Sequence, residues 1–343
     1  MKRVLIFVHK WLGVALALLF LMWFASGIVL YFVPFPSLTQ GERLAGMASL
    51  ELGADCCLGA QDAAARAGLT WSEARLGMHA GSPVWRLLTK DPERRWRVLD
   101  ARSGKALAPL DTAAAVALAE AFSGRRARGA EVLERDQWTV AQGLNPHRPL
   151  VRVELDDPDG LELYVSPHAA EVVVETRRGE RLWNWVGAVP HWIYFTELRR
   201  WPERWHNVVL GLSLPGVVLA ASGLVLGIWQ LYLNRTRWIP YRKFWMRWHH
   251  ILGLAASVVA LTWILSGLLS MNPFGVFSAR GATSAERDNW LGARAAVIVD
   301  PAEALRLAAP FEAVEIDLLQ LDGQLWYRIR GKPGAARQQL LVR

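Results

Sequence analysis

Cysteine and the common cofactor-binding motifs are nearly absent from this chain of 343 residues. Its only cysteines are the adjacent Cys56 and Cys57. Neighbouring Cα atoms lie only ~3.8 Å apart and rarely accommodate a relaxed disulfide, so we expect a structural or incidental pair. The lack of a C-x-x-C-H sequence excludes covalent c-type haem. The lack of P-loop, dinucleotide-binding, G-x-S-x-G and H-E-x-x-H motifs leaves no recognisable nucleotide, flavin or hydrolase site.

Apolar and aromatic residues, in contrast, are abundant. The chain is 52% hydrophobic and has 18 tryptophans, a composition typical of membrane spans flanked by interfacial aromatic belts. Three apolar stretches, residues 4–33, 205–233 and 248–271, are long enough to cross a bilayer as helices. The first is longer than the ~7–15 residues of a signal-peptide apolar region and no convincing cleavage site follows it, so we interpret it as a retained span. Pro215-Gly216 predicts a kink in the second.

Positive charge is placed unevenly along the chain, whose net charge is +8. Lys2, Arg3 and Lys10 belong to the start of the first span. The loop 234–247 has basic residues and no acidic one: Arg235, Arg237, Arg242, Lys243 and Arg247. This placement follows the positive-inside rule and does not indicate a nucleic-acid surface. We therefore expect the N-terminus and this loop in the cytoplasm, membrane lipid as a partner, and no nucleic-acid partner.

The stretch between the first two spans is soluble in character and contains an internal repeat. A strand pattern begins at Pro83, turns at Asp91-Pro92 and resumes at Arg97, and the same order recurs from Pro149. Short alanine-rich helices are expected at residues 61–67, 111–122 and 301–309. The sequence therefore predicts helix-plus-hairpin modules at residues 50–109 and 110–182, and a third at 292–343.

The third module stops at Arg343 inside a hairpin strand, whereas the equivalent strand of the first module continues. We expect a truncated chain whose longer parent would complete this module and add a fourth span. Residues 183–204 are rich in tryptophan, which indicates a segment at the outer membrane–water boundary. The predicted fold class is an α-helical transmembrane bundle, with three spans here and four in the parent, carrying α+β modules on the outer side.

One motif occurs twice and organises the chain. Its first copy runs from His9 to Gly13 and continues with Trp23-Phe24-Ala25-Ser26-Gly27. Its second copy runs from His249 to Gly253 and continues with Trp263-Ile264-Leu265-Ser266-Gly267. Because ionisable groups inside membrane helices are costly, two histidines in matching motifs indicate a functional site.

Haem iron is the obvious ligand for these histidines. Parallel first and third helices would place His9 and His249 near the cytoplasmic face, and a glycine four residues on leaves room for a flat macrocycle. We predict that His9 and either His249 or His250 bind one non-covalent haem b. The repeat favours His249, but pattern alone does not decide; adjacent helical residues point ~100° apart, so only one faces a given haem. The alternative is that these histidines contact lipid headgroups.

His206 is predicted to bind the iron of a second haem. It lies at the start of the second span, near the opposite membrane face. A haem there would complete a transmembrane electron path. Its other ligand stays open between His191, in the aromatic segment, and a residue of the missing fourth span. His191 has two alternative interpretations, an aromatic-belt residue or a group that contacts substrate.

The remaining candidates have plainer interpretations. The histidines His79, His147 and His168 are expected to be solvated on the surface. The serines that precede glycine are expected to make small-residue helix contacts; they are Ser26, Ser222 and Ser266. The basic loop 124–128 could attract an anionic metal complex, but a solvated loop is the favoured interpretation.

At these residues the chain resembles the PepSY-associated transmembrane protein family. The resemblance rests on His-Lys-Trp-Leu-Gly from His9, Pro-His-Trp-Ile-Tyr-Phe around His191, Arg-Trp-His-Asn around His206 and Trp-His-His-Ile-Leu-Gly around His249. The tandem modules look like PepSY domains. Similar family members include inner-membrane siderophore reductases with four spans and two haems. By resemblance, His9, His206 and His249 or His250 fall on the family's histidine-bearing motifs.

The predicted function is that of a haem-b reductase of the bacterial inner membrane, with PepSY-like modules in the periplasm. It would pass electrons from quinol or a cytoplasmic reductase to periplasmic ferric siderophore and release iron as Fe(II). The alternative is a non-enzymatic PepSY scaffold that regulates peptidases or senses the envelope. A siderophore permease fits less well, because three spans with few polar interior residues offer no obvious pathway.

Overall fold

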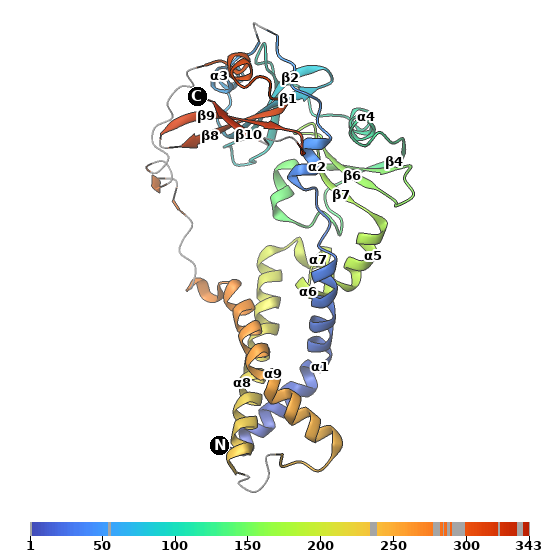
Figure 1. Cartoon of the computed structure of the whole chain (residues 1–343), viewed down its shortest axis with the longest axis vertical. Coiled ribbons are helices and arrows are strands. Elements are labelled where there is room, and N and C mark those ends of the chain that lie inside the picture. Colours follow the sequence, from blue (N-terminus) through green and yellow to red (C-terminus); the bar gives the residue numbers. More distant parts are fainter. Residues whose placement is uncertain are drawn as a thin grey trace. The chain divides into compact units, whose positions relative to one another are not determined.

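The computed structural model describes residues 2–53, 56–233, 239–276, 282–283, 285–286, 289, 299–321, 323–334 and 339–342. The chain divides into two compact units, each described here by itself (Figure 1). The helical unit comprises Met1–Val33 and Asn184–Gly281. The sheet unit comprises Pro34–Trp183 and Ala282–Arg343.

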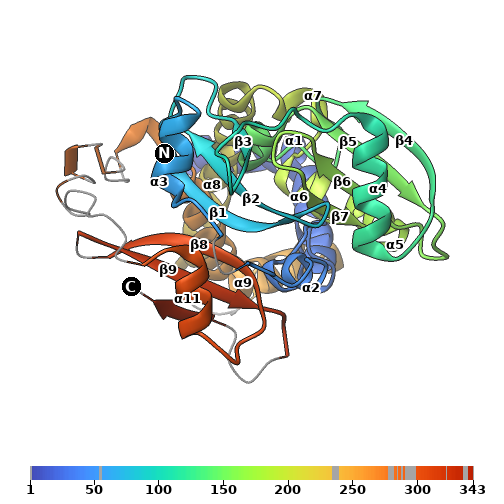
Figure 2. The same cartoon turned by 90° about the horizontal axis from the view of Figure 1, so that it is seen from above.

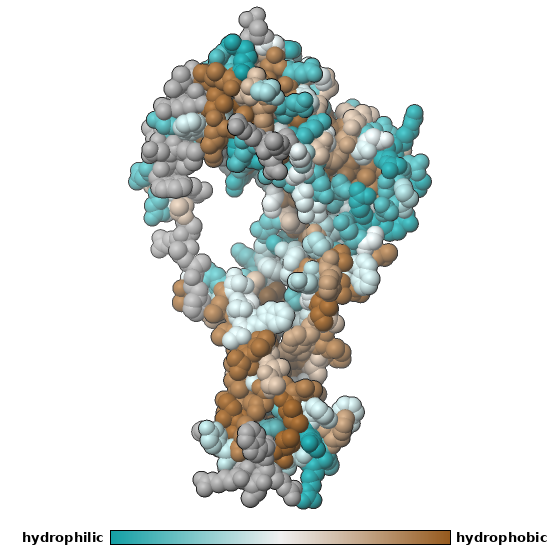
Figure 3. Space-filling model, viewed as in Figure 1, coloured by the Kyte–Doolittle hydropathy of each residue, from teal (hydrophilic) through white to brown (hydrophobic). Residues whose placement is uncertain are grey.

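Three long helices build the helical unit: α1 (Lys2–Phe32), α8 (Pro202–Leu233) and α9 (Phe244–Ser270). All three are long and apolar enough to cross a membrane, as predicted, and Figure 3 shows their mainly hydrophobic surface. Helix α1 ends just before Val33-Pro34, because proline lacks an N–H and disfavours helical geometry in the residue before it. Helix α8 packs against both α1 and α9.

Short helices occupy the stretch predicted as an aromatic boundary segment. They are α5 (Arg178–Val186), α6 (Ala188–Trp192) and α7 (Thr196–Arg199). Helix α6 packs against α1, and α7 packs against α8. Helix α9 begins at Phe244, within the predicted loop 234–247, whose first part lies outside the described residues.

The first sheet of the sheet unit is antiparallel and has six strands in the order β10-β9-β8-β1-β2-β3. The strands are β1 (Trp71–His79), β2 (Ser82–Thr89), β3 (Trp96–Asp100), β8 (Ala313–Leu321), β9 (Gln324–Gly331) and β10 (Gln339–Val342). Strand β1 pairs with β8, so the first and third predicted modules share one sheet instead of forming separate ones (Figure 2). This pairing satisfies strand edges that each module would otherwise expose.

The second sheet has four antiparallel strands in chain order: β4 (Ala127–Leu133), β5 (Leu150–Leu155), β6 (Glu162–Ser166) and β7 (Glu171–Thr176). Helix α4 (Thr112–Ser123) covers it (Figure 2). Ala115 and Ala119 of α4 pack on buried valines and leucines of β5 and β6. The Asp111 side chain caps the helix start, and Gly124 ends it in the left-handed conformation with φ 67°.

Alanine faces also bring helices close to the six-stranded sheet. The two helices that do so are α3 (Ala60–Arg66) and α11 (Pro301–Leu307). Helix α2 (Gln40–Ala45) is another short helix of this unit. Small side chains such as Ala63 and Ala304 lie against the large buried residues Trp85, Ile316 and Tyr327. One face of this sheet is therefore apolar, while the other remains available for polar groups.

Two expectations from the sequence concern the adjacent cysteines and the C-terminal module. The Cys56 and Cys57 sulfurs, expected to form a structural or incidental pair, are joined in a disulfide. The predicted truncation falls on Arg343, and the start of the third predicted module on residues 292–298; both lie outside the described residues.

The expectation of solvated histidines in this unit is wrong for His147. Its ring stacks on Trp96 with the centroids 5.7 Å apart, and its Nδ1 lies 3.1 Å from Ser166 Oγ. Burial lowers the pKa of this imidazole to about 4. His79, the last residue of β1, and His168, in the turn between β6 and β7, are also half-buried.

Candidate functional site

His9 extends from α1 toward α8, which holds one nitrogen of its ring. The Nδ1 atom lies 3.3 Å from the Leu219 carbonyl oxygen and 3.2 Å from Ser222 Oγ. A carbonyl oxygen can only accept, so Nδ1 donates the proton of the neutral ring and the lone pair stays on Nε2. An imidazole whose Nδ1–H is tied to a backbone carbonyl is oriented for metal binding through Nε2.

A glycine on α8 makes this close approach possible. A Cβ atom built on Gly223 would lie 2.7 Å from Cε1 of His9. Contacts that short do not occur between carbon atoms in folded proteins, so a side chain at this position would displace the ring. Ser222 and Gly223 together therefore fix the orientation and position of His9.

His191 on α6 is held by the same arrangement on α1. Its Nδ1 lies 3.1 Å from the Trp23 carbonyl oxygen and 3.3 Å from Ser26 Oγ. A Cβ atom on Gly27 would lie 3.0 Å from Cε1 of this ring. The same donor argument leaves the lone pair of His191 on Nε2.

The serine–glycine pairs thus have a more specific role than the predicted helix contacts. Ser26 Oγ donates to the Trp23 carbonyl at 3.2 Å and Ser222 Oγ to the Leu219 carbonyl at 2.9 Å, so each hydroxyl can accept the histidine N–H. The third pair differs. Ser266 donates to the Trp263 carbonyl in the same way, but a Cβ on Gly267 would meet no described atom within 4 Å beyond its own helix and chain neighbours.

The structure brings His9 and His249 together, the pair that the sequence repeat favours. Their ring centroids are 6.2 Å apart and the ring planes are inclined by 53°. Two imidazole nitrogens on opposite sides of one iron, each ~2 Å away, place the ring centres ~6 Å apart. Gly253, four residues beyond His249, also faces open space among the described residues. These residues therefore fit a bis-histidine haem.

His250 has different neighbours from His249. Its side chain is 8% exposed, and its ring meets that of Tyr241 edge-on at 5.5 Å. Its Nε2 has no hydrogen-bond partner among the described residues. His249 and His250 have different neighbours because consecutive residues of a helix point ~100° apart.

A cavity of about 470 Å³ lies beside His191 within the helical unit. Its volume falls within the usual ~300–1,000 Å³ range of small-molecule sites. Helices α1, α6, α8 and α9 all contribute to its wall, which is largely aromatic: Phe20, Trp23, Phe24, Trp192, Tyr194, Trp205 and Trp263. The cavity can thus hold a large flat apolar group.

His206, the predicted ligand on α8, does not line this cavity. It is half-buried, and it makes no ring contact with another histidine among the described residues. The preceding Trp205 is the residue that reaches the cavity, and its Nε1 donates to the Trp192 carbonyl at 2.9 Å. Arg199 stacks over this indole at 4.6 Å. The aromatic run around Pro190 was the signal for this wall.

Among the described residues, no three His, Cys, Asp or Glu side chains come close enough to form a metal site made wholly of protein ligands. A haem needs only two such ligands, and His9 and His249 can provide them. Comparison of the chain with known protein families, curated proteins and solved structures finds no match in any of the three. The family resemblance carried by the sequence motifs therefore stays a prediction.

Proposed function

We propose that the chain is a haem-b electron-transfer protein of a membrane, with one haem bound between His9 and His249. The observation that carries this proposal is the pairing of these rings at 6.2 Å while the Nδ1 of His9 is tied to the Leu219 carbonyl. A lipid-contacting histidine would have no need of a serine, a carbonyl and a glycine arranged around it. Such a support is typical of imidazoles that bind metals.

A second haem in the aromatic cavity beside His191 would extend the electron path. The matching support of His191 by Ser26 and Gly27 favours this histidine over His206 as the ligand. The tryptophan wall would exclude water and hold the macrocycle by its faces. When bound, haem supplies one-electron chemistry, while the protein's residues orient, bury and separate the sites.

The substrate we propose is a ferric siderophore in the periplasm. Siderophores hold Fe(III) far more tightly than Fe(II), so transfer of one electron to the complexed iron releases it as Fe(II). Quinol or a cytoplasmic reductase would supply that electron from the other side of the inner membrane. This reductase activity rests on the sequence resemblance, whereas haem binding also has the histidine geometry in its favour.

The protein purified from membranes should give a dithionite-minus-oxidised spectrum with b-type Soret and α bands. Haem extraction as the pyridine haemochrome should give one or two haems per polypeptide. A colourless protein after expression with added haem precursor would contradict haem function. It would leave the non-enzymatic PepSY scaffold as the better interpretation.

Two glycine substitutions should act on the two haem sites separately. Gly223→Ala should displace His9 because its Cβ would lie 2.7 Å from the ring, and Gly27→Ala should displace His191. Loss of such support typically lowers metal affinity by ~10–100-fold, so each variant should lose haem from its own site. Spectral titration with haem measures the two affinities.

Gly211→Ala, on α8 and away from the lining of the aromatic cavity, is the matched control, since its Cβ meets no described atom within 4 Å beyond its own helix. It should bind haem as the unsubstituted protein does. Equal affinities in Gly223→Ala and Gly211→Ala would show that His9 is not an iron ligand.

A further inference from the structure

The second face of the six-stranded sheet carries a row of charged side chains. Strand register places Arg86 opposite Arg75, Arg75 opposite Asp317, and Asp317 opposite Arg328. These residues alternate along their strands with the apolar residues that face α3 and α11. Like charges directly opposite each other in a sheet are destabilising, so the Arg75–Arg86 neighbours need compensation.

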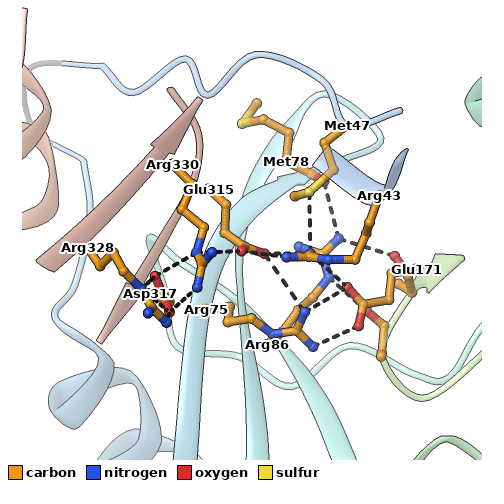
Figure 4. A network of polar contacts seen from close by, with 12 residues as sticks. Arg43, Met47, Arg75, Met78, Arg86, Glu171, Glu315, Asp317, Arg328 and Arg330 are labelled. Atoms are coloured by element: carbon orange, nitrogen blue, oxygen red, sulfur yellow. Dashed lines mark hydrogen bonds and ion pairs between the residues drawn. The ribbon is translucent and has the colours of Figure 1, made fainter. Parts of the chain in front are cut away.

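Five arginines form a cluster at this face of the sheet: Arg43, Arg75, Arg86, Arg328 and Arg330. Carboxylates compensate four of them (Figure 4). Arg43 binds Glu315 through two nitrogens at 2.7 Å each. Arg75 binds Glu171 at 2.7 Å. Arg328 and Arg330 both pair with Asp317. Five arginines, counted with Arg86, thus face three carboxylates, which leaves a difference of two positive charges.

Within this cluster, Arg86 is the arginine that makes no ion pair with a described residue. It is 3% exposed and donates to the carbonyl oxygens of Ala169, Ala170 and Met78 at 2.8, 3.1 and 3.3 Å. Its Nη1 has no hydrogen-bond partner among the described residues. Burial lowers the pKa of this guanidinium, which expresses the cost of holding its charge away from water.

A cavity of about 690 Å³ is lined by Arg86 and by His79, which also has a buried nitrogen without a partner among the residues described. That nitrogen is Nδ1 of His79, which is buried and lacks a hydrogen bond within the described part of the chain. Other parts of the wall are apolar, from Met47, Leu118 and Phe122. The exposed side chains of Glu51 and Lys332 also line the cavity, and their opposite charges cancel.

We infer that this cavity binds a small organic carboxylate, with its oxygens on Arg86 Nη1 and His79 Nδ1 and its hydrocarbon part against Met47, Leu118 and Phe122. Arg86 Nη1 is a donor, and His79 Nδ1 is a donor in the tautomer that carries its proton there, so the two nitrogens match the two oxygens of a carboxylate. A phosphate would bring two further oxygens and no group for the apolar wall. Charge-assisted hydrogen bonds to a guanidinium are among the strongest in proteins, and the anion would offset part of the excess positive charge. The site is independent of haem.

Calorimetry on the whole chain of 343 residues in lipid nanodiscs tests this site, with empty nanodiscs as the blank. Benzoate and benzamide have nearly the same shape and differ in charge. Benzoate should bind at least ~10-fold more tightly than benzamide, because only the carboxylate carries a negative charge to pair with the buried guanidinium of Arg86. Inorganic phosphate should bind more weakly than benzoate. Equal binding of benzoate and benzamide, or tighter binding of phosphate, overturns the inference.

Variants locate the binding in this cavity. Arg86→Met should abolish benzoate binding. Because this variant also loses three carbonyl contacts and can fail to fold, His79→Leu, at the half-buried end of β1, is the deciding one. It should weaken benzoate binding by ~10-fold through the lost hydrogen bond to a charged group. His168→Leu is the matched control and should leave the affinity unchanged. Equal affinities in His79→Leu and the unsubstituted protein count against the site.

Discussion

Replacing His9 by alanine should remove one haem equivalent of Soret absorbance per polypeptide. An alanine has no nitrogen for iron, and the support built by Ser222 and Gly223 cannot supply one. His249→Ala should cause the same loss, because its ring pairs with that of His9 at 6.2 Å. Pyridine haemochrome content, normalised to protein, measures both. Added imidazole should restore part of the absorbance of His9→Ala, since the vacated space matches the lost ring.

His250→Ala is the sharpest control for this assignment. It removes a neighbouring histidine whose ring contacts that of Tyr241, so haem content should stay unchanged. If His250→Ala loses haem and His249→Ala retains it, the pairing of His9 with His249 is the wrong assignment. If all three variants retain full haem, the iron ligands lie elsewhere in the chain.

The long helices could be predicted because one property, an unbroken apolar run, fixes them. The predicted spans and the observed α1, α8 and α9 differ by only a few residues at their ends. Strand β1 was missed, although its neighbour β2 was predicted. One face of β1 carries Glu73 and Arg75, and Gly77 interrupts its pattern, so this strand resembles a loop in sequence. The charged residues of β1 find partners only in the folded protein, where β1 pairs with β8 from the other end of the chain.

The candidate haem site was predictable only in part, for a related reason. A repeated motif is visible in the sequence, and its matching offsets favour His249 as the partner of His9, but they do not decide between His249 and His250. The support around His191 depends on Ser26 and Gly27, which lie far from it in the chain. A serine followed by glycine in an apolar helix normally indicates close helix packing, and nothing local shows that a histidine will occupy the space. Ser26 and Gly27 support a histidine only because the fold brings His191 into contact with them.

Replacing Glu171 by glutamine should destabilise the sheet unit by ~3–5 kcal/mol, the usual cost of removing one partner from a buried ion pair. Glu171 binds Arg75 at 2.7 Å and lies 3.6 Å from Arg43. The amide keeps the shape but leaves these guanidinium groups, and the nearby Arg86, with less negative charge. Hydrogen exchange of peptides from β1 and β2, measured on the whole chain of 343 residues, reports the change. Asp156→Asn, at the exposed ion pair with Arg128, is the control and should cost less than ~1 kcal/mol.

The same carboxylate should make the sheet unit sensitive to acid. Despite burial, which opposes ionisation, the guanidinium groups of Arg75, Arg43 and Arg86 lower the pKa of Glu171 from 4.5 to about 2. A lowered pKa means that the stabilisation, ~3 kcal/mol for this shift, is complete above the ordinary value and is lost as the pH falls from 4.5 toward 2. Calorimetric melting should therefore show a large gap between the unsubstituted protein and Glu171→Gln at pH 7 that narrows across this window. A gap of constant size would mean that the carboxylate contributes through its shape and not through its charge.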